Sequence, residues 1–108
     1  MRKKYRCLIK NEYTHKNYSL GTIQVNEIEK IRIWRNKNIK ILRQIKKIEK
    51  KQQVLYFQKN IWPDMKIKQP KNILLSFKKN NVLIGYGGLV HISWENKRSE
   101  ISFIMGDI

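Results

Sequence analysis

Apolar residues recur at every second position over much of the last third of the chain, and this period of two is typical of β-strands. The first run covers residues 82–94 and the second covers residues 101–105. Between them lies a polar stretch, residues 95–98, which predicts a loop. The pattern therefore predicts one long antiparallel hairpin.

The predicted loop sets the register of the hairpin. With a loop at residues 95–98, Ile92 lies opposite Ile101 and His91 lies opposite Ser102. His91 and Glu100 are then diagonal neighbours about 7 Å apart, and one water molecule could join them. A slip of one residue would exchange the two faces of the hairpin. This register predicts an apolar face with Val90, Ile92, Ile101 and Phe103, and a polar face with His91, Ser93, Glu100 and Ser102.

Three glycines, Gly85, Gly87 and Gly88, lie inside the first strand of this hairpin. Glycine weakens a strand, so its presence there predicts a bulge or the close approach of a backbone or a ligand. A dinucleotide-binding glycine loop is excluded, because such a loop opens a helix and no helical pattern follows these residues.

Two helices are predicted before the hairpin. Apolar residues at a spacing of three predict a short helix over residues 27–35, with Asn26 as its N-cap and Glu29 as the partner in a capping box. A second helix is predicted over residues 49–61, ending before Pro63. Its predicted apolar face carries Val54, Phe57 and Ile61, whereas Gln52, Gln53 and Gln58 lie elsewhere.

The remaining segments predict two strands and a basic connection. Strands are expected at residues 18–25 and 73–77, and Asn80 and Asn81 suit the turn into the hairpin because asparagine tolerates positive φ. In residues 39–48, apolar residues recur at every third position and basic residues lie between them. They predict either a helical turn with a solvated basic face or a phosphate-binding patch.

The length and the order of elements predict one small domain. The chain has 108 residues, of which 41% are hydrophobic. A strand, two helices and three antiparallel strands give a mixed α/β (α+β) fold. Residues 1–17 are basic and have no clear period, so they predict a poorly ordered arm or an added edge segment. Residues 18–108 form the predicted domain.

The net charge of +16, from 24 basic and 8 acidic residues, invites a nucleic-acid interpretation. Lysine, isoleucine and asparagine are abundant together and share A/T-rich codons, so the base composition of the gene explains the charge more simply. A non-catalytic basic module for nucleic acid or another polyanion stays open as the alternative function. We expect a cytoplasmic protein, because no apolar run is long enough for a membrane span or a signal peptide.

Few residues suit a metal or a disulfide. Cys7 is the single cysteine of the chain, and His15 and His91 are its two histidines. Their spacing matches no metal-binding pattern, so no metal is expected.

Several stretches together resemble one enzyme family. Trp34-Arg35-Asn36, Tyr56-Phe57, Asn72-Ile73-Leu74 and the stretch IGYGGLVHISWENKRSEISFIM appear in an order that is similar to the first half of a GNAT N-acetyltransferase. The branch that it resembles contains ribosomal-protein and amino-sugar N-acetyltransferases. The resemblance covers residues 18–106.

This resemblance implies the transfer of an acetyl group from acetyl-coenzyme A to a primary amine, on an amino sugar or a protein N-terminus. It implies that the pantetheine arm of the cofactor binds at Ile104, Met105 and Gly106. The amine must lose a proton before it attacks, and His91 and Glu100 are the candidate catalytic residues. The same two residues also fit the ordinary polar face of a sheet.

One difference from the family lies at the end of the sequence. In the family, a glycine-containing loop that binds the cofactor pyrophosphate follows the strand matching residues 100–105. The sequence stops at Asp107-Ile108, before such a loop. We therefore expect a truncated, acetyltransferase-type half with an open strand edge and one bare sheet face, for which stand-alone activity is in doubt. A truncated gene, a remnant and a half-enzyme completed by a second chain all fit this expectation.

Overall fold

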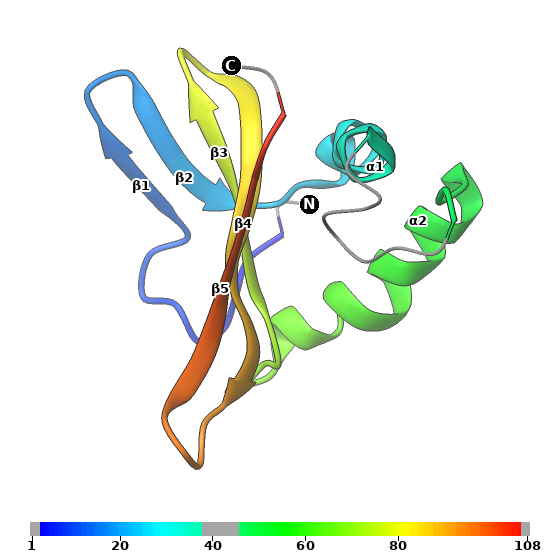
Figure 1. Cartoon of the computed structure of the whole chain (residues 1–108). Helices are drawn as coiled ribbons and strands as arrows, with labels where there is room; N and C mark the ends of the chain where they lie inside the picture. Colours follow the sequence, from blue (N-terminus) through cyan, green and yellow to red (C-terminus); the bar gives the residue numbers. More distant parts are fainter. Residues whose placement is uncertain (1–2, 38–45, 107–108) are drawn as a thin grey trace.

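The computed structural model describes residues 3–37 and 46–106, which form an antiparallel sheet with helices on one of its faces (Figure 1). The strands lie in the order of the chain across the sheet, so the α+β class is confirmed. The strands are β1 (Glu12–His15), β2 (Tyr18–Thr22), β3 (Ile73–Lys79), β4 (Val82–Ser93) and β5 (Arg98–Met105), and the helices are α1 (Ile28–Lys37) and α2 (Lys50–Tyr56).

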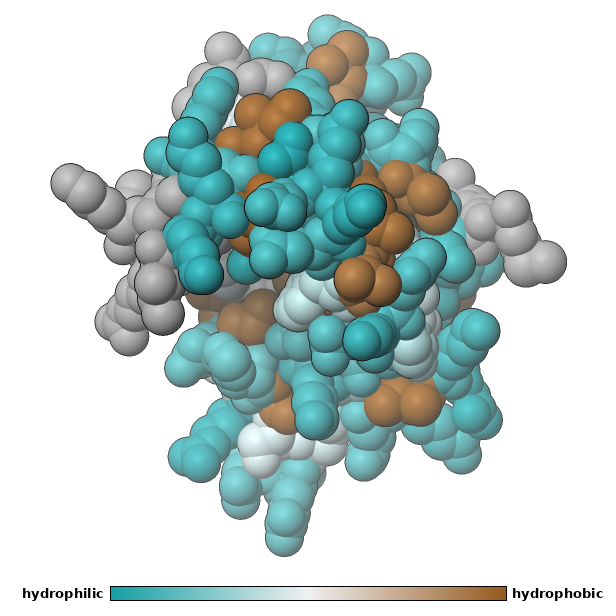
Figure 2. Space-filling view, turned by 90° about the vertical axis from the view of Figure 1, so that its right-hand side faces the viewer, coloured by the Kyte–Doolittle hydropathy of each residue, from teal (hydrophilic) through white to brown (hydrophobic). Residues whose placement is uncertain are grey.

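The main core lies between the two helices and the sheet. It consists of the buried side chains of Ile23, Ile28, Ile31, Trp34, Phe57, Ile61 and Leu83. Figure 2 looks onto the side of the molecule where the helices lie and shows a mainly hydrophilic surface with separate apolar patches. None of the helices in the described residues is long and apolar enough to cross a membrane.

The basic N-terminal residues contribute to the sheet in two ways. Residues 12–15 form β1, an edge strand that pairs with β2. Tyr5 is buried, and its hydroxyl oxygen accepts a hydrogen bond of 2.9 Å from the backbone N–H of Leu74. That N–H lies beyond the end of β2, whose last pair is Thr22 with Leu75. Tyr5 therefore supplies the hydrogen-bond partner that β2 does not reach.

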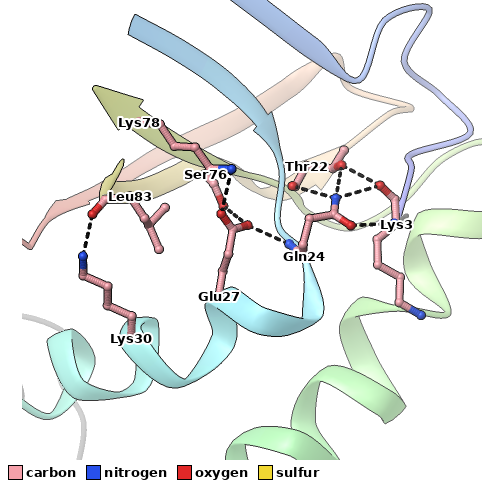
Figure 3. Close-up of polar contacts among 8 residues, drawn as sticks. All are labelled: Lys3, Thr22, Gln24, Glu27, Lys30, Ser76, Lys78 and Leu83. Atoms are coloured by element: carbon pink, nitrogen blue, oxygen red, sulfur yellow. Dashed lines mark hydrogen bonds and ion pairs between the residues drawn. The ribbon is translucent and has the colours of Figure 1, made fainter. Parts of the chain in front are cut away.

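A buried carboxylate joins the start of α1 to the sheet (Figure 3). Glu27 is 6% exposed and accepts hydrogen bonds of 2.8 Å from the backbone N–H of Gln24 and from the Ser76 hydroxyl. Its second oxygen lies 3.2 Å from Nζ of Lys78. These contacts neutralise a charge that burial would otherwise disfavour.

The predicted capping pair at this helix was wrong. A short 3-10 turn, Val25–Glu27, precedes α1, and this turn directs Glu27 rather than Glu29 back to the chain entering the helix. Glu29 instead accepts a hydrogen bond of 2.6 Å from the guanidinium of Arg32. The extra turn could not be read from Asn26, because asparagine suits both a cap and a 3-10 turn.

The second helix has the predicted extent, but its buried face differs. Its final turn, Phe57–Ile61, is a π-helix that the backbone bond from Trp62 to Phe57 closes at 2.7 Å. Phe57 and Ile61 are buried as predicted, whereas Val54 is exposed and Gln53 is buried in its place. The Gln53 amide is buried because it donates a 2.9 Å hydrogen bond to the carbonyl of Ile28. Most of the predicted basic connection, residues 39–48, lies outside the described residues.

The hairpin is confirmed, but its predicted register was wrong. Val90 pairs with Glu100 and Leu89 pairs with Ile101, and the connecting turn covers residues 94–97. An irregularity between Val90 and Ser93 gives β4 one more residue than β5, which is a β-bulge. The predicted register assumed that both strands ran without an extra residue.

The corrected register divides the predicted apolar face between the two sides of the sheet. Val90 and Glu100 share the side that the helices cover. Ile101, which is 81% exposed, lies on the other side together with Phe103 and Met105. Within the described residues β5 pairs with β4 alone, and its apolar side chains on that side are exposed (Figure 1). Ile73 of β3 lies on the same side but is buried against Tyr5 and Met65. The expected open edge is therefore present in this part of the chain, whereas the expected bare face is present only at β5.

The glycines of β4 lie where neighbouring strands approach closely, as one of the two sequence-based explanations predicted. A Cβ atom on Gly87 would meet the carbonyl oxygen of Ser102 in β5. A Cβ atom on Gly88, whose φ is 150°, would meet the carbonyl oxygen of Ile73 in β3. Side chains at these positions would therefore push one or the other neighbour away from β4.

We expect Glu27→Gln to lower the free energy of unfolding by about 2 kcal/mol, because the variant leaves Lys78 without its charged partner and weakens two buried hydrogen bonds. Urea denaturation measures this loss. Glu29→Gln is the matched control, since its ion pair with Arg32 is exposed and contributes little. Equal losses in the two variants would contradict the assigned role of Glu27.

Candidate functional site

A hollow of about 620 Å³ lies between the helices and the sheet. Few side-chain atoms from the sheet enter the hollow. In the row across the sheet that faces it, Leu74 of β3 pairs with Gly88 of β4, and Gly88 pairs with Ser102 of β5. Gly88 has no side chain and that of Ser102 is small, so this row leaves space beneath the helices. The residues around the hollow are Ile31, Arg35, Tyr56, Phe57, Lys71, Asn72, Leu74, Tyr86, Val90, His91, Ile92 and Ser102.

The β-bulge places His91 at the hollow. His91 has a φ of 51°, a conformation that residues with a Cβ atom seldom adopt. Its backbone N–H donates a 3.3 Å hydrogen bond to Oδ1 of Asn72, and the N–H of Ile92 donates one of 2.9 Å to the carbonyl of Lys71. The segment before β3 thus satisfies the backbone groups that the bulge removes from the ladder, and the imidazole is redirected.

The structure brings the two predicted catalytic residues together. Nε2 of His91 lies 3.9 Å from Oε2 of Glu100, and the side chains are 78% and 73% exposed. Their predicted diagonal placement about 7 Å apart came from the wrong register. The bulge beside Val90, the partner of Glu100, brings the imidazole to the carboxylate instead. His91 lines the hollow, Glu100 lies beside His91, and both side chains are open to solvent.

The three predicted cofactor-binding residues face different directions. Ile104 packs on the main core, and the backbone N–H of Gly106 donates a 2.7 Å hydrogen bond to the carbonyl of Ile84. A Cβ atom on Gly106 would meet the ring of Trp34, so this residue also packs closely on α1. The N–H and C=O groups of successive residues in an antiparallel strand point to opposite edges. Because the N–H of Gly106 points to β4, the main-chain groups of Met105 point to the free edge of β5.

His91 is the only residue at the hollow that the sequence singled out as a site residue; among the others are Arg35, Tyr56, Lys71, Asn72 and Tyr86. All of these five except Lys71 belong to stretches that carry the family resemblance, and this was the available signal. Burial raises the pKa of Tyr86 to about 12, although the nearby Arg35 guanidinium acts in the opposite direction. Tyr86 is therefore a neutral hydroxyl at physiological pH.

The arrangement suits proton transfer at the edge of a pocket. An imidazole can accept a proton from a bound group, and a carboxylate about 4 Å away can orient the ring and balance the charge that forms. Within residues 3–37 and 46–106, no three His, Cys, Asp or Glu side chains gather as a metal site would require.

Comparison with known proteins identifies one family. A family model described as an acetyltransferase (GNAT) domain matches residues 20–107. The match includes both helices, β3, β4, β5 and all the residues around the hollow. No curated protein and no solved structure matches the chain.

We expect His91→Gly to be about 1 kcal/mol more stable than His91→Ala, because only glycine adopts a positive φ without steric cost. Both variants lack the imidazole and keep the backbone bond to Asn72, so their difference isolates the strain of the bulge. Urea denaturation of the two variants measures it. An alanine variant as stable as the glycine variant would mean that residue 91 carries no such strain.

We expect the wild-type protein to lose about 1 kcal/mol of stability relative to Tyr86→Phe between pH 10 and pH 11. The unfolded chain releases the tyrosine proton near pH 10, whereas the folded protein keeps it until about pH 12. Ionisation thus favours the unfolded state as the pH rises through this window. Denaturation curves at both pH values test this, and curves that shift in parallel for the two proteins would contradict it.

Proposed function

Because this chain belongs to the acetyltransferase (GNAT) domain family, we propose that it transfers an acetyl group from acetyl-coenzyme A to a primary amine. GNAT domains perform acyl transfer in general. The observation that carries the proposal beyond the family is the pair His91 and Glu100 beside a hollow large enough for a small acceptor. Pockets for small molecules commonly measure about 300–1,000 Å³.

In the proposed reaction the acceptor enters the hollow as an ammonium ion. Nε2 of His91 takes one proton from it, and the carboxylate of Glu100 balances the positive charge on the ring. The free amine then attacks the thioester carbonyl. The new C–N bond forms and the C–S bond breaks, the second proton of the amine passes to the departing thiolate so that coenzyme A leaves as the thiol, and His91 then releases its proton to solvent.

We place the pantetheine arm along the free edge of β5. The backbone groups of Ile101, Phe103 and Met105 point to this edge, since Gly106 bonds to β4 and the direction alternates along the strand. Unpaired N–H and C=O groups of this kind suit the amides of pantetheine. Five residue steps separate Met105 from Glu100, or about 17 Å along the strand, so an extended arm must join the two ends.

The predicted cofactor residues have separate roles in this proposal. Met105 offers its main-chain groups to the arm, whereas Ile104 and Gly106 hold the end of β5 against β4 and α1. The exposed apolar side chains of β5 also suit completion of the site by a second chain, one of the situations that the sequence left open.

We propose an amino sugar as the acceptor in preference to a protein N-terminus. The hollow of about 620 Å³ is bounded on one side by side chains of the helices and on the other by the sheet, which favours a compact molecule over an extended peptide. Assignment to the branch of ribosomal-protein and amino-sugar acetyltransferases remains part of this proposal.

Calorimetric titration of the 108-residue chain tests the cofactor part of the proposal. We expect acetyl-coenzyme A to bind more tightly than an inorganic polyphosphate and to retain its binding when the salt concentration is raised. Binding that polyphosphate matches and that salt abolishes would instead support the alternative, a basic module for polyanions.

Substitutions at the pair test the chemical part. We expect His91→Gln and Glu100→Gln each to lower the rate of acetyl transfer to glucosamine about 100-fold while leaving the affinity for acetyl-coenzyme A unchanged. Release of the coenzyme A thiol measures the rate. His15→Gln and Glu95→Gln are matched controls, because both are exposed and lie outside the hollow. Wild-type rates in the His91 and Glu100 variants would refute their catalytic role.

A further inference from the structure

Two positively charged side chains, Arg35 and Lys71, line the hollow from different elements. Arg35 comes from the last turns of α1 and Lys71 from the segment before β3. The guanidinium carbon of Arg35 lies 5.8 Å from the centre of the Tyr56 ring. Within the described parts of the chain, neither cation forms an ion pair with a carboxylate. Both charges are therefore available to a ligand.

A second hollow of about 400 Å³ adjoins the first one. The two share Tyr56, Lys71 and Asn72, and the second adds the cation of Lys59. Asp64 also lines it, but Oδ2 of Asp64 accepts hydrogen bonds of 2.9 Å and 3.2 Å from the backbone N–H groups of Lys71 and Asn72. This carboxylate holds the segment in place and does not pair with the Lys71 ammonium.

The segment that carries Lys71 is bonded to the bulge that carries His91. The carbonyl of Lys71 accepts from the N–H of Ile92 at 2.9 Å, and Oδ1 of Asn72 accepts from the N–H of His91 at 3.3 Å. A cation and the candidate base are thus fixed to each other through the main chain. A ligand that contacts both would carry its anionic group and its amine close together.

We propose that the acceptor is a small amine that also bears a phosphate or a carboxylate, and that Arg35 and Lys71 bind this anionic group while the amine faces His91 and Glu100. The inference rests on the proposed function and specifies the substrate class of the same site. The planar guanidinium of Arg35 can bind two oxygens of the group at once, and the Lys71 ammonium adds a point charge.

The abundance of lysine requires a control for charge alone. The chain has 24 basic residues, so some of them will lie beside a cavity even where they have no role in binding. Lys68 is exposed, lies three residues before Lys71 and lines neither hollow. Lys68→Gln therefore removes the same charge from the same region without touching the proposed site.

The test compares matched amines by calorimetry at 150 mM salt, a concentration near which exposed charges more than about 8 Å apart are screened. Glucosamine 6-phosphate is compared with glucosamine, and alanine with alaninamide, so that phosphate and carboxylate are tested separately. We expect at least one of the two anionic amines to bind about tenfold more tightly than its partner without the anionic group. Arg35→Gln and Lys71→Gln should each remove most of this difference, and Lys68→Gln should keep it.

The outcomes separate this inference from the proposed function. Three results would overturn the inference. The two amines of each pair could bind equally tightly, none of the four amines could bind, or Lys68→Gln and Lys71→Gln could lose the same amount of affinity for the anionic amine. Acetyl-coenzyme A is titrated in parallel. If it binds while the anionic amines bind no more tightly than their partners without the anionic group, the inference fails and the proposed function stands. If anionic amines bind through Arg35 and Lys71 while acetyl-coenzyme A does not bind, the site assignment stands and the proposed function fails.

Discussion

The position of α1 on the sheet depends on the buried carboxylate of Glu27. Its bonds to Ser76 and Lys78 anchor the 3-10 turn that precedes the helix to β3, the strand next to β4. A second polar contact, 2.8 Å from Nζ of Lys30 to the carbonyl of Leu83, joins the next turn to β4 (Figure 3). With the helix held at these points, Arg35 lies over the hollow. The polar network under α1 thus positions a residue two turns away.

The candidate site lies where the sheet departs from regular geometry. Gly88 removes a side chain from the helix-facing row, and the bulge turns His91 out of the ladder into a positive φ. A regular strand would have filled the hollow and kept the imidazole away from Glu100. Strained backbone at such a position is characteristic of functional sites, where the surrounding bonds hold a conformation that the residue alone disfavours. Here the supporting bonds come from Lys71 and Asn72.

The sequence predicted the elements well and their fine geometry less well. Period-two patterns located β4 and β5, and Asn80 and Asn81 do adopt the positive φ expected of their turn. The register failed for two reasons: the turn lies at residues 94–97 and not at 95–98, and the bulge adds a residue without changing the apolar pattern that would reveal it. Likewise, Gln53 appeared polar and exposed until the structure supplied the carbonyl of Ile28 as its partner. The sequence placed His91 near Glu100 despite the error in register, because the two residues lie on adjoining strands.

The net positive charge of the protein and the two cations at the hollow act on anionic ligands in different ways. A net charge of +16 attracts any anion to the whole surface, so it raises encounter rates without selecting a ligand. In the proposed reaction acetyl-coenzyme A is anionic, and so is the acceptor that we propose for Arg35 and Lys71. The anionic groups of the two ligands would repel each other if they lay close together. Cations at the acceptor side would reduce this repulsion, and the distance between the free end of β5 and Glu100 would keep the phosphates of the cofactor away from the acceptor.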